Sequence, residues 1–153
     1  MSFVVDCSII IRLLASQPGD DLLRQRLART VHAPALIDPE VSSVVRGLAI
    51  TGSPKRITAT RATQMLTDYA GLPIVRYPMK PLQARVFELR HNFTAYDAMY
   101  VALAELLSLP LLTDDAKFGG TPGHHAQIHH YPDDPEDPAQ PEDGDPPGTP
   151  DPG

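Results

Sequence analysis

The sequence of 153 residues contains no tryptophan and a single cysteine, Cys7. One cysteine excludes an internal disulfide. Because no histidine lies near it in the sequence, we interpret it as a small buried residue and not as a nucleophile. The chain also lacks a basic and apolar leader segment and any run of eighteen apolar residues. These absences predict a soluble, cytoplasmic protein with no membrane partner.

Lysine and arginine are absent from residues 132–153, which contain eight acidic residues and eight prolines. This stretch has no large apolar side chain to bury, so nothing compensates the entropy of ordering it, and we expect a disordered acidic, proline-rich tail. Residues 1–131 carry thirteen basic and eleven acidic side chains, a net charge of +2. This part is long enough for one core, and its charge permits a nucleic-acid partner once a metal offsets its acids.

Short apolar runs alternate with helical patterns along residues 1–131 and predict a sheet between layers of helices. The expected strands cover residues 1–5, 31–36, 72–76, 109–112 and 126–131. The expected helices cover residues 9–14, 21–30, 39–52, 55–70, 82–90 and 95–107, and a turn is expected at 119–123. The first turn lacks the glycines of a Rossmann domain, and no P-loop occurs. We therefore predict a three-layer α/β/α sandwich with a mostly parallel sheet.

Residues 89–118 show the pattern of a helix, a buried strand and an acidic turn. Thr94 stands three residues ahead of Asp97, which is the spacing of a capping box. We expect the Thr94 hydroxyl to cap the helix over 95–107, and the Asp97 carboxylate to accept from the backbone N–H of the cap. Pro110 stops this helix, and the apolar run at 109–112 leads into Thr113, Asp114 and Asp115. One carboxylate thus opens a helix, and another follows a strand.

Two further acidic residues occupy junctions of the same kind. Asp6 ends the apolar run 3–5, and Glu40 follows Asp38 and Pro39, which we expect to cap and open a helix. Each acid alone has a structural explanation, because carboxylates are favoured in the first turn of a helix. In a parallel α/β sheet, however, such junctions meet at the carboxyl edge, where ligands bind. The repetition therefore favours four carboxylates in one crevice.

Four neighbouring carboxylates repel one another unless a cation lies between them. Carboxylate oxygens are the ligands that Mg²⁺ and Mn²⁺ prefer, and phosphate is a natural further ligand of such an ion. A cation in this position can activate water and offset charge on a leaving oxygen. The reaction class implied is metal-dependent phosphodiester hydrolysis, with the number of ions left open.

Four histidines near the C-terminal end of the predicted domain resemble a zinc site at first sight; they are His124, His125, His129 and His130. They form adjacent pairs, and adjacent residues of a strand point to opposite faces, so at most two or three of them converge. Because the carboxylates already supply a site for a hard cation, we interpret the histidines as surface residues.

Four segments carry a family resemblance: VVDCS at 4–8, PEVSSVVRG at 39–47, NFTAYDAMYVALAE at 92–105 and LPLLTDDAKF at 109–118. They resemble the PIN-domain ribonucleases, and among these the VapC toxins of type II toxin–antitoxin pairs. The resemblance covers about residues 1–131 and implies an α/β/α sandwich with four or five strands. The acidic tail departs from the pattern, because the family does not require it.

Position by position, the resemblance implies catalytic and metal-binding roles for the residues that match the family's acidic motif, which are Asp6, Glu40, Asp97 and Asp115. Asp115 is preferred to Asp114 because Thr113 stands two residues ahead of it, as the family's threonine does. Asp114 is then a helix cap or an auxiliary ligand. Ser8, Asn92 and Thr113 match polar side chains that support the ligands, although Ser8 also suits the cap of the helix over 9–14.

The resemblance implies an endoribonuclease that depends on Mg²⁺ or Mn²⁺ and acts as the toxin of a pair, with RNA as substrate. It also implies a VapB-like antitoxin as partner and a homodimer. The alternative is a catalytically inactive PIN-like module that binds RNA or protein. The presence of all four acids favours the enzyme. Recognition of RNA by shape and loops leaves no short motif, so the sequence does not predict the RNA or the cleavage site.

Overall fold

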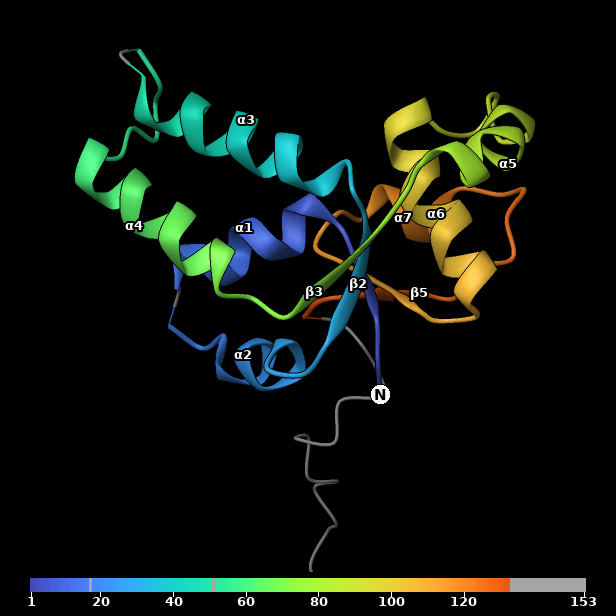
Figure 1. Ribbon diagram of the computed structural model, residues 1–153, viewed down its shortest axis with the longest axis horizontal. Helices are drawn as coiled ribbons and strands as arrows, with labels where there is room; N and C mark the ends of the chain where they lie inside the picture. The colour runs from blue at the N-terminus through green and yellow to red at the C-terminus, as the bar shows by residue number, and fades with distance from the viewer. Residues whose placement is uncertain (17, 51, 133–153) are drawn as a thin grey trace, which may run out of the picture.

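The computed structural model describes residues 1–16, 18–50 and 52–132, and within them a five-stranded sheet carries helices on both faces (Figure 1). The strands are β1 Val4–Val5, β2 Val31–Pro34, β3 Ile74–Tyr77, β4 Leu111–Thr113 and β5 Ile128–His130. The helices are α1 Cys7–Ala15, α2 Asp21–Leu27, α3 Ile37–Ala49, α4 Ala59–Ala70, η1 Lys80–Leu82, α5 Gln83–Glu88, α6 Ala95–Leu107 and α7 Lys117–Gly120. All the strand pairs are parallel, which confirms the predicted sandwich. The predicted tail lies outside the described residues apart from Pro132.

The strand order is β3-β2-β1-β4-β5. The chain builds one half of the sheet outward from β1 to β3 and then crosses back to add β4 and β5 on the other side of β1. Such a reversal opens a crevice at the carboxyl ends of the two central strands, where open α/β sheets bind ligands. Val5 pairs with Leu112 across β1 and β4, so the residues that follow them, Asp6 and Thr113, come side by side at this crevice.

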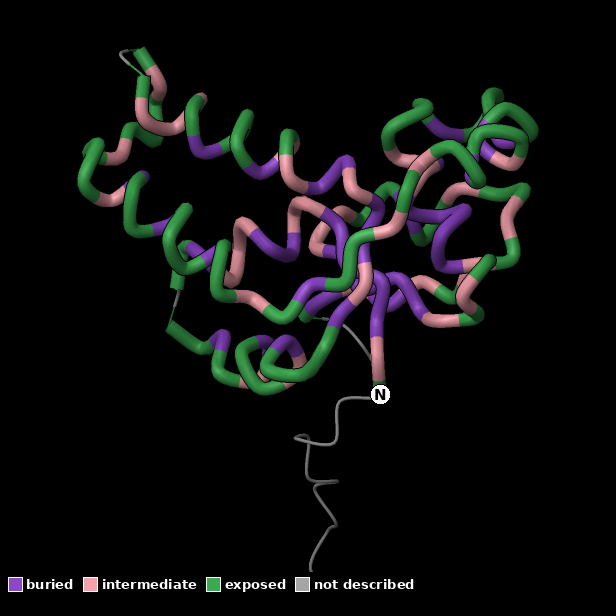
Figure 2. The backbone as a smooth tube through the Cα atoms, viewed as in Figure 1, coloured by how far each residue is buried: buried purple, intermediate pink, exposed green. Residues whose placement is uncertain are grey.

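Helix α6 is the inner helix of one layer and contacts β1, β2 and β4. It is apolar around most of its circumference, as predicted, and its buried residues are Ala98, Tyr100, Val101, Ala102, Leu103 and Ala104. Helices α1 to α4 lie on the other side of the sheet from α5 and α6 (Figure 1). Buried residues follow the strands and the inward helix faces, and exposed residues follow the outer faces (Figure 2).

The start of α6 agrees with the sequence prediction, whereas the starts of three other helices do not. Thr94 caps α6, and its hydroxyl accepts a hydrogen bond of 3.2 Å from the backbone N–H of Asp97. Helix α1 begins at Cys7 and is capped by Asp6, so Ser8 is not the cap. Helix α4 begins later than predicted and is capped by Thr58.

Helix α3 begins at Ile37, so the prediction that Asp38 caps it is wrong. The Asp38 carboxylate accepts hydrogen bonds from Tyr69 at 2.6 Å and from Arg76 at 2.9 Å. These partners come from α4 and β3, and they take the carboxylate away from its own backbone. The predicted turn at 119–123 also contains the end of the short helix α7.

His129 is buried, with 5% of its surface exposed, so the surface interpretation is wrong for this histidine. It lies on β5, and its ring packs edge-on against Phe3 with 5.9 Å between ring centroids. His130, the next residue of the strand, is only partly buried, as the alternation of a strand requires. None of the helices in the described ranges is long and apolar enough to cross a membrane.

Candidate active site

A pocket of about 390 Å³ lies at the carboxyl ends of β1 and β4, and all four predicted acids line it. Asp6 follows β1, Glu40 and Asp97 stand in the first turns of α3 and α6, and Asp115 follows β4. The remaining lining residues are Cys7, Ser8, Ile11, Val44, Tyr100, Lys117 and Phe118. The structure therefore brings together four acids that are far apart in the sequence. Their catalytic and metal-binding roles stay predictions.

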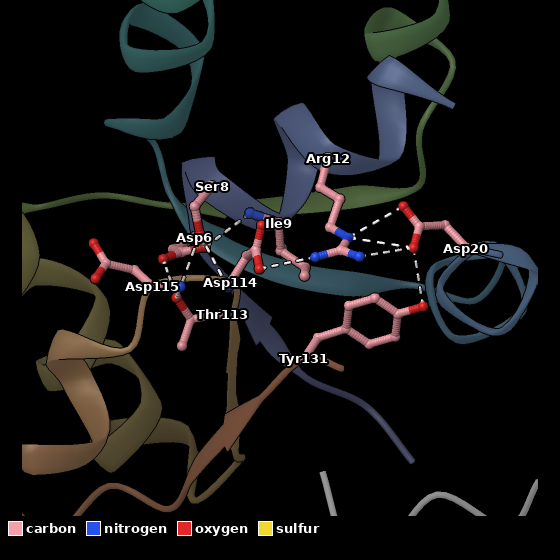
Figure 3. Close-up of polar contacts among 9 residues, drawn as sticks. All are labelled: Asp6, Ser8, Ile9, Arg12, Asp20, Thr113, Asp114, Asp115 and Tyr131. Atoms are coloured by element: carbon pink, nitrogen blue, oxygen red, sulfur yellow. Dashed lines mark hydrogen bonds and ion pairs between the residues drawn. The ribbon is translucent and has the colours of Figure 1, made fainter. Parts of the chain in front are cut away.

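Asp6 is the most buried of these acids, with 5% of its surface exposed. Its carboxylate accepts hydrogen bonds from the Thr113 hydroxyl at 2.6 Å, from the Ser8 hydroxyl at 2.7 Å and from the backbone N–H of Ile9 at 3.1 Å (Figure 3). Burial raises the pKa of Asp6 above its ordinary value, although these hydrogen bonds act in the opposite direction. The carboxylate is thus fixed in orientation and short of solvation, which favours a nearby cation.

The hydroxyls of Ser8 and Thr113 also hold the turn that follows β4. The backbone N–H of Asp115 donates to Thr113 Oγ1 at 2.9 Å, and the backbone N–H of Asp114 donates to Ser8 Oγ at 3.1 Å. Thr113 is fully buried, so its hydroxyl has a fixed set of partners. Both residues therefore tie the end of β4 to Asp6.

Glu40 is held by Tyr100, a residue that the sequence prediction missed. The Tyr100 hydroxyl donates a hydrogen bond of 2.6 Å to Glu40 Oε1. Burial raises the pKa of this hydroxyl, and the hydrogen bond to Glu40 raises it further, so Tyr100 stays a donor. The available signal was spacing, because Tyr100 follows Asp97 by three residues and lies on the same face of α6.

Asp97 and Asp115 share an ammonium group that the sequence prediction also missed. Lys117 Nζ lies 3.0 Å from Asp97 Oδ2 and 3.0 Å from Asp115 Oδ2. Burial lowers the pKa of Lys117, but its hydrogen bonds to the two carboxylates outweigh this effect and raise the pKa above its ordinary value. The expectation that Asp97 would reach back to the cap of α6 is corrected, because its carboxylate is paired with Lys117 instead.

Of the predicted supporting residues, only Ser8 lines the pocket. Thr113 contacts it through Asp6, whereas Asp114 and Asn92 have other roles. The Asp114 carboxylate accepts a hydrogen bond of 3.0 Å from Arg12 and points away from Asp115 (Figure 3). Asn92 is exposed, and its amide donates to the carbonyl of Pro122. Gly123, with a φ of +91°, follows this carbonyl, and a Cβ there would meet the Asn92 amide. Asn92 thus supports a loop. Asp114 forms an ion pair with Arg12 and does not lie in the position of a metal ligand.

Cys7 lines the pocket without being reactive. Burial raises the pKa of its thiol to about 12, and the charges of Glu40 and Asp6 contribute to the shift. A thiol with this pKa stays protonated at neutral pH, so it is a poor nucleophile and a poor metal ligand.

The donor set of the pocket suits a hard divalent cation, because it consists of carboxylate oxygens. Over the described ranges, no three His, Cys, Asp or Glu side chains lie close enough together to hold a metal ion. The Lys117 ammonium lies between two of the four acids instead. The donor atoms of the pocket are of the kind that Mg²⁺ and Mn²⁺ prefer, and the position between Asp97 and Asp115 is taken by the Lys117 ammonium.

Comparison with known proteins identifies the family of this chain. Residues 3–123 match the PIN domain family. Ribonuclease VapC12 of Mycobacterium tuberculosis is 35% identical over 126 residues, which are 82% of this chain and 95% of that relative. Ribonuclease VapC9 of the same organism is 39% identical over 119 residues, which are 77% of this chain and 89% of that relative.

A solved structure adds the fold. A toxin–antitoxin complex from Klebsiella pneumoniae superposes with a TM-score of 0.57 at 20% identity, covering 77% of this chain and 91% of that chain. Four acids at the switch point of a parallel sheet, a family match over most of the described chain and relatives named as VapC ribonucleases agree with one another. The chain belongs to the PIN-domain family and, within it, to the VapC-type ribonucleases.

Proposed function

We propose that this protein is a divalent-metal-dependent endoribonuclease that hydrolyses phosphodiester bonds of RNA and acts as the toxin of a toxin–antitoxin pair. The observation that carries the proposal is the pocket in which carboxylates from four separate segments meet. A site of this composition attracts a hard cation and, through it, phosphate. The VapC-type relatives, named as ribonucleases, support RNA as the substrate class.

In this proposal Asp6, Glu40, Asp97 and Asp115 hold Mg²⁺ or Mn²⁺. When bound, such an ion supplies charge neutralisation at the scissile phosphate and activates water for attack. The protein's own contribution is orientation: the hydroxyls of Thr113 and Ser8 fix Asp6, and Tyr100 fixes Glu40. Ligand carboxylates held by such hydrogen bonds keep their geometry during the reaction.

We further propose an antitoxin partner of the VapB type and a homodimer. Support for the first comes from the Klebsiella pneumoniae structure, which is a toxin–antitoxin complex. An arginine of such a partner would pair with the acidic pocket, because a guanidinium bonds carboxylates in a bidentate way.

The test is cleavage of RNA by the purified protein with Mn²⁺ or Mg²⁺ and with a chelator. Asp97→Asn removes one acid of the pocket, and Asp68→Asn makes the same change at an exposed position of α4 outside it. We expect cleavage with metal by the wild type and by Asp68→Asn, and loss of cleavage with the chelator or in Asp97→Asn. Cleavage in the chelator, or by Asp97→Asn at the wild-type rate, would contradict the proposal. Binding of RNA without any cleavage would favour the inactive module.

A further inference from the structure

Lys117 is the one cationic side chain among the described residues that line the acidic pocket. Its Nζ lies 3.0 Å from Oδ2 of Asp97 and 3.0 Å from Oδ2 of Asp115. The same two carboxylates are predicted ligands of the metal. The ammonium therefore uses oxygen atoms that a divalent cation between these acids would also need.

Lys117 reaches this position from the start of α7, two residues after Asp115. Its backbone N–H donates to Asp115 Oδ1 at 3.1 Å, so both oxygens of this carboxylate contact the same residue. The Lys117 side chain is 52% exposed, whereas those of Asp97 and Asp115 are 24% and 36% exposed. The ammonium sits on a flexible four-carbon stem beside water, so it can leave the carboxylates without disturbing the backbone.

On the basis of the metal-dependent function proposed above, we propose that Lys117 is a tethered cation that competes with the metal for Asp97 and Asp115 and thereby sets the metal affinity of the site. The ammonium neutralises the two carboxylates when no metal is bound. A metal ion that binds between the two acids displaces it, because the two cations would occupy the same place and repel each other. Lys117 is then a residue that tunes the affinity of the site and is not itself a ligand.

This competition has two consequences of opposite sign when Lys117 loses its charge. The metal binds more tightly to the variant. In the wild type only a fraction of the sites is free of the ammonium, and the apparent affinity is reduced in proportion to that fraction. The metal-free fold becomes less stable, because Asp97 and Asp115 face each other without the ammonium between them. A residue that serves only the structure would lower stability without raising metal affinity.

The experiment measures Mn²⁺ binding by calorimetry or by the spectroscopic signal of free Mn²⁺, together with thermal unfolding in a chelator. Lys117→Met removes the charge and keeps the length of the side chain, and Lys117→Arg keeps the charge. Lys80→Met makes the same change at an exposed residue of η1 outside the pocket. We expect Lys117→Met to bind Mn²⁺ about tenfold more tightly than the wild type, which corresponds to carboxylates that are free about a tenth of the time.

We expect the metal-free Lys117→Met protein to melt about 3 °C lower than the wild type. Lys117→Arg and Lys80→Met should bind Mn²⁺ like the wild type. Equal or weaker Mn²⁺ binding by Lys117→Met, with wild-type binding intact, would overturn the competition and leave the proposed function standing. Absence of Mn²⁺ binding by both proteins would overturn the competition and the metal-dependent function together.

Discussion

The hydroxyl of Tyr100 donates a hydrogen bond of 2.6 Å to Glu40 and joins α6 to the first turn of α3 inside the acidic pocket. A second tyrosine makes a bond of the same kind outside the pocket, where Tyr69 donates to Asp38 at 2.6 Å. The two pairs resemble each other in chemistry and differ in location. Substituting each tyrosine in turn therefore distinguishes an effect on the acidic pocket from a general effect on the stability of the fold.

We expect Tyr100→Phe to slow RNA cleavage about tenfold, because a hydrogen bond to a charged group contributes about 1.5 kcal/mol and its loss frees Glu40 to reorient. The ring stays buried, so the free energy of unfolding should fall by only about 1 kcal/mol. Cleavage rates and urea unfolding of the purified variant measure both quantities.

Tyr69→Phe is the matched control for this change and should cleave RNA like the wild type. Equal cleavage rates for the two tyrosine variants would show that Tyr100 has no role in orienting Glu40.

The stability of the metal-free protein should depend on pH through Asp6, because burial raises the pKa of this carboxyl above 3.8, its ordinary value. The folded protein then holds the proton more tightly than the unfolded chain does. Asp6 therefore stabilises the fold below 3.8, and this contribution is lost as pH rises through the folded-state pKa. Asp6→Asn cannot ionise, so we expect it to melt at a higher temperature than the wild type at neutral pH. Thermal unfolding in a chelator across pH measures this difference.

Asp68→Asn, which changes an exposed carboxylate, should follow the wild-type pH profile. An Asp6→Asn protein that is less stable than the wild type at neutral pH would show that the hydrogen bonds of Asp6 outweigh its burial.

Arg12 pairs with Asp114 and also with Asp20, whose side chain is only 3% exposed. Its guanidinium donates to Asp20 at 3.1 Å, and the Tyr131 hydroxyl donates to the same carboxylate at 3.2 Å (Figure 3). Arg12→Met leaves a buried charge without its main partner, which should destabilise the fold by about 3 kcal/mol. Asp20→Asn in the same chain should restore part of this loss. Chemical unfolding of the single and double variants measures the coupling.

Arg24→Met provides the comparison, because Arg24 pairs with Asp21 on the surface, where the two side chains are 43% and 81% exposed. Its loss should change stability by less than about 1 kcal/mol. Additive effects of Arg12→Met and Asp20→Asn would contradict the buried pair.

The parts of the structure that depend on local pattern were predictable from the sequence. The bounds of α6 follow from the Thr94 cap and from Pro110, and the gathering of the acids follows from where parallel strands end. Partners brought by packing were not predictable. Asp38 has the local features of a cap, but Tyr69 and Arg76 compete successfully for its carboxylate.

The same distinction applies inside the site. The sequence shows that Tyr100 lies three residues from Asp97, but its bond to Glu40 depends on how α6 packs relative to α3. Lys117 lies two residues from Asp115, but its contact with Asp97 depends on the turn into α7. His129 is buried and its ring packs against Phe3, a contact that no local pattern indicates.

We propose that residues 132–153 are not part of the nuclease domain, since eight acids and eight prolines leave nothing to pack. Truncation after Tyr131 should keep the melting temperature and the cleavage pattern of the full chain. If the acids compete with RNA phosphate for basic side chains, truncation should also tighten RNA binding at low salt and much less at high salt. Unfolding or loss of cleavage on truncation would show that the tail belongs to the domain.

If the acidic pocket is the site of metal-dependent RNA cleavage, two adjacent residues should differ in their effect on the reaction. Asp115 lines the pocket, whereas Asp114 points away from it and pairs with Arg12. The measurement is the rate of RNA cleavage with Mn²⁺ by Asp115→Asn and by Asp114→Asn. We predict a loss of about a hundredfold or more for Asp115→Asn, because the metal contributes several kcal/mol to the transition state, and a rate near that of the wild type for Asp114→Asn. Equal rates for the two variants, or a larger loss for Asp114→Asn, would show that the acidic pocket is not the cleavage site.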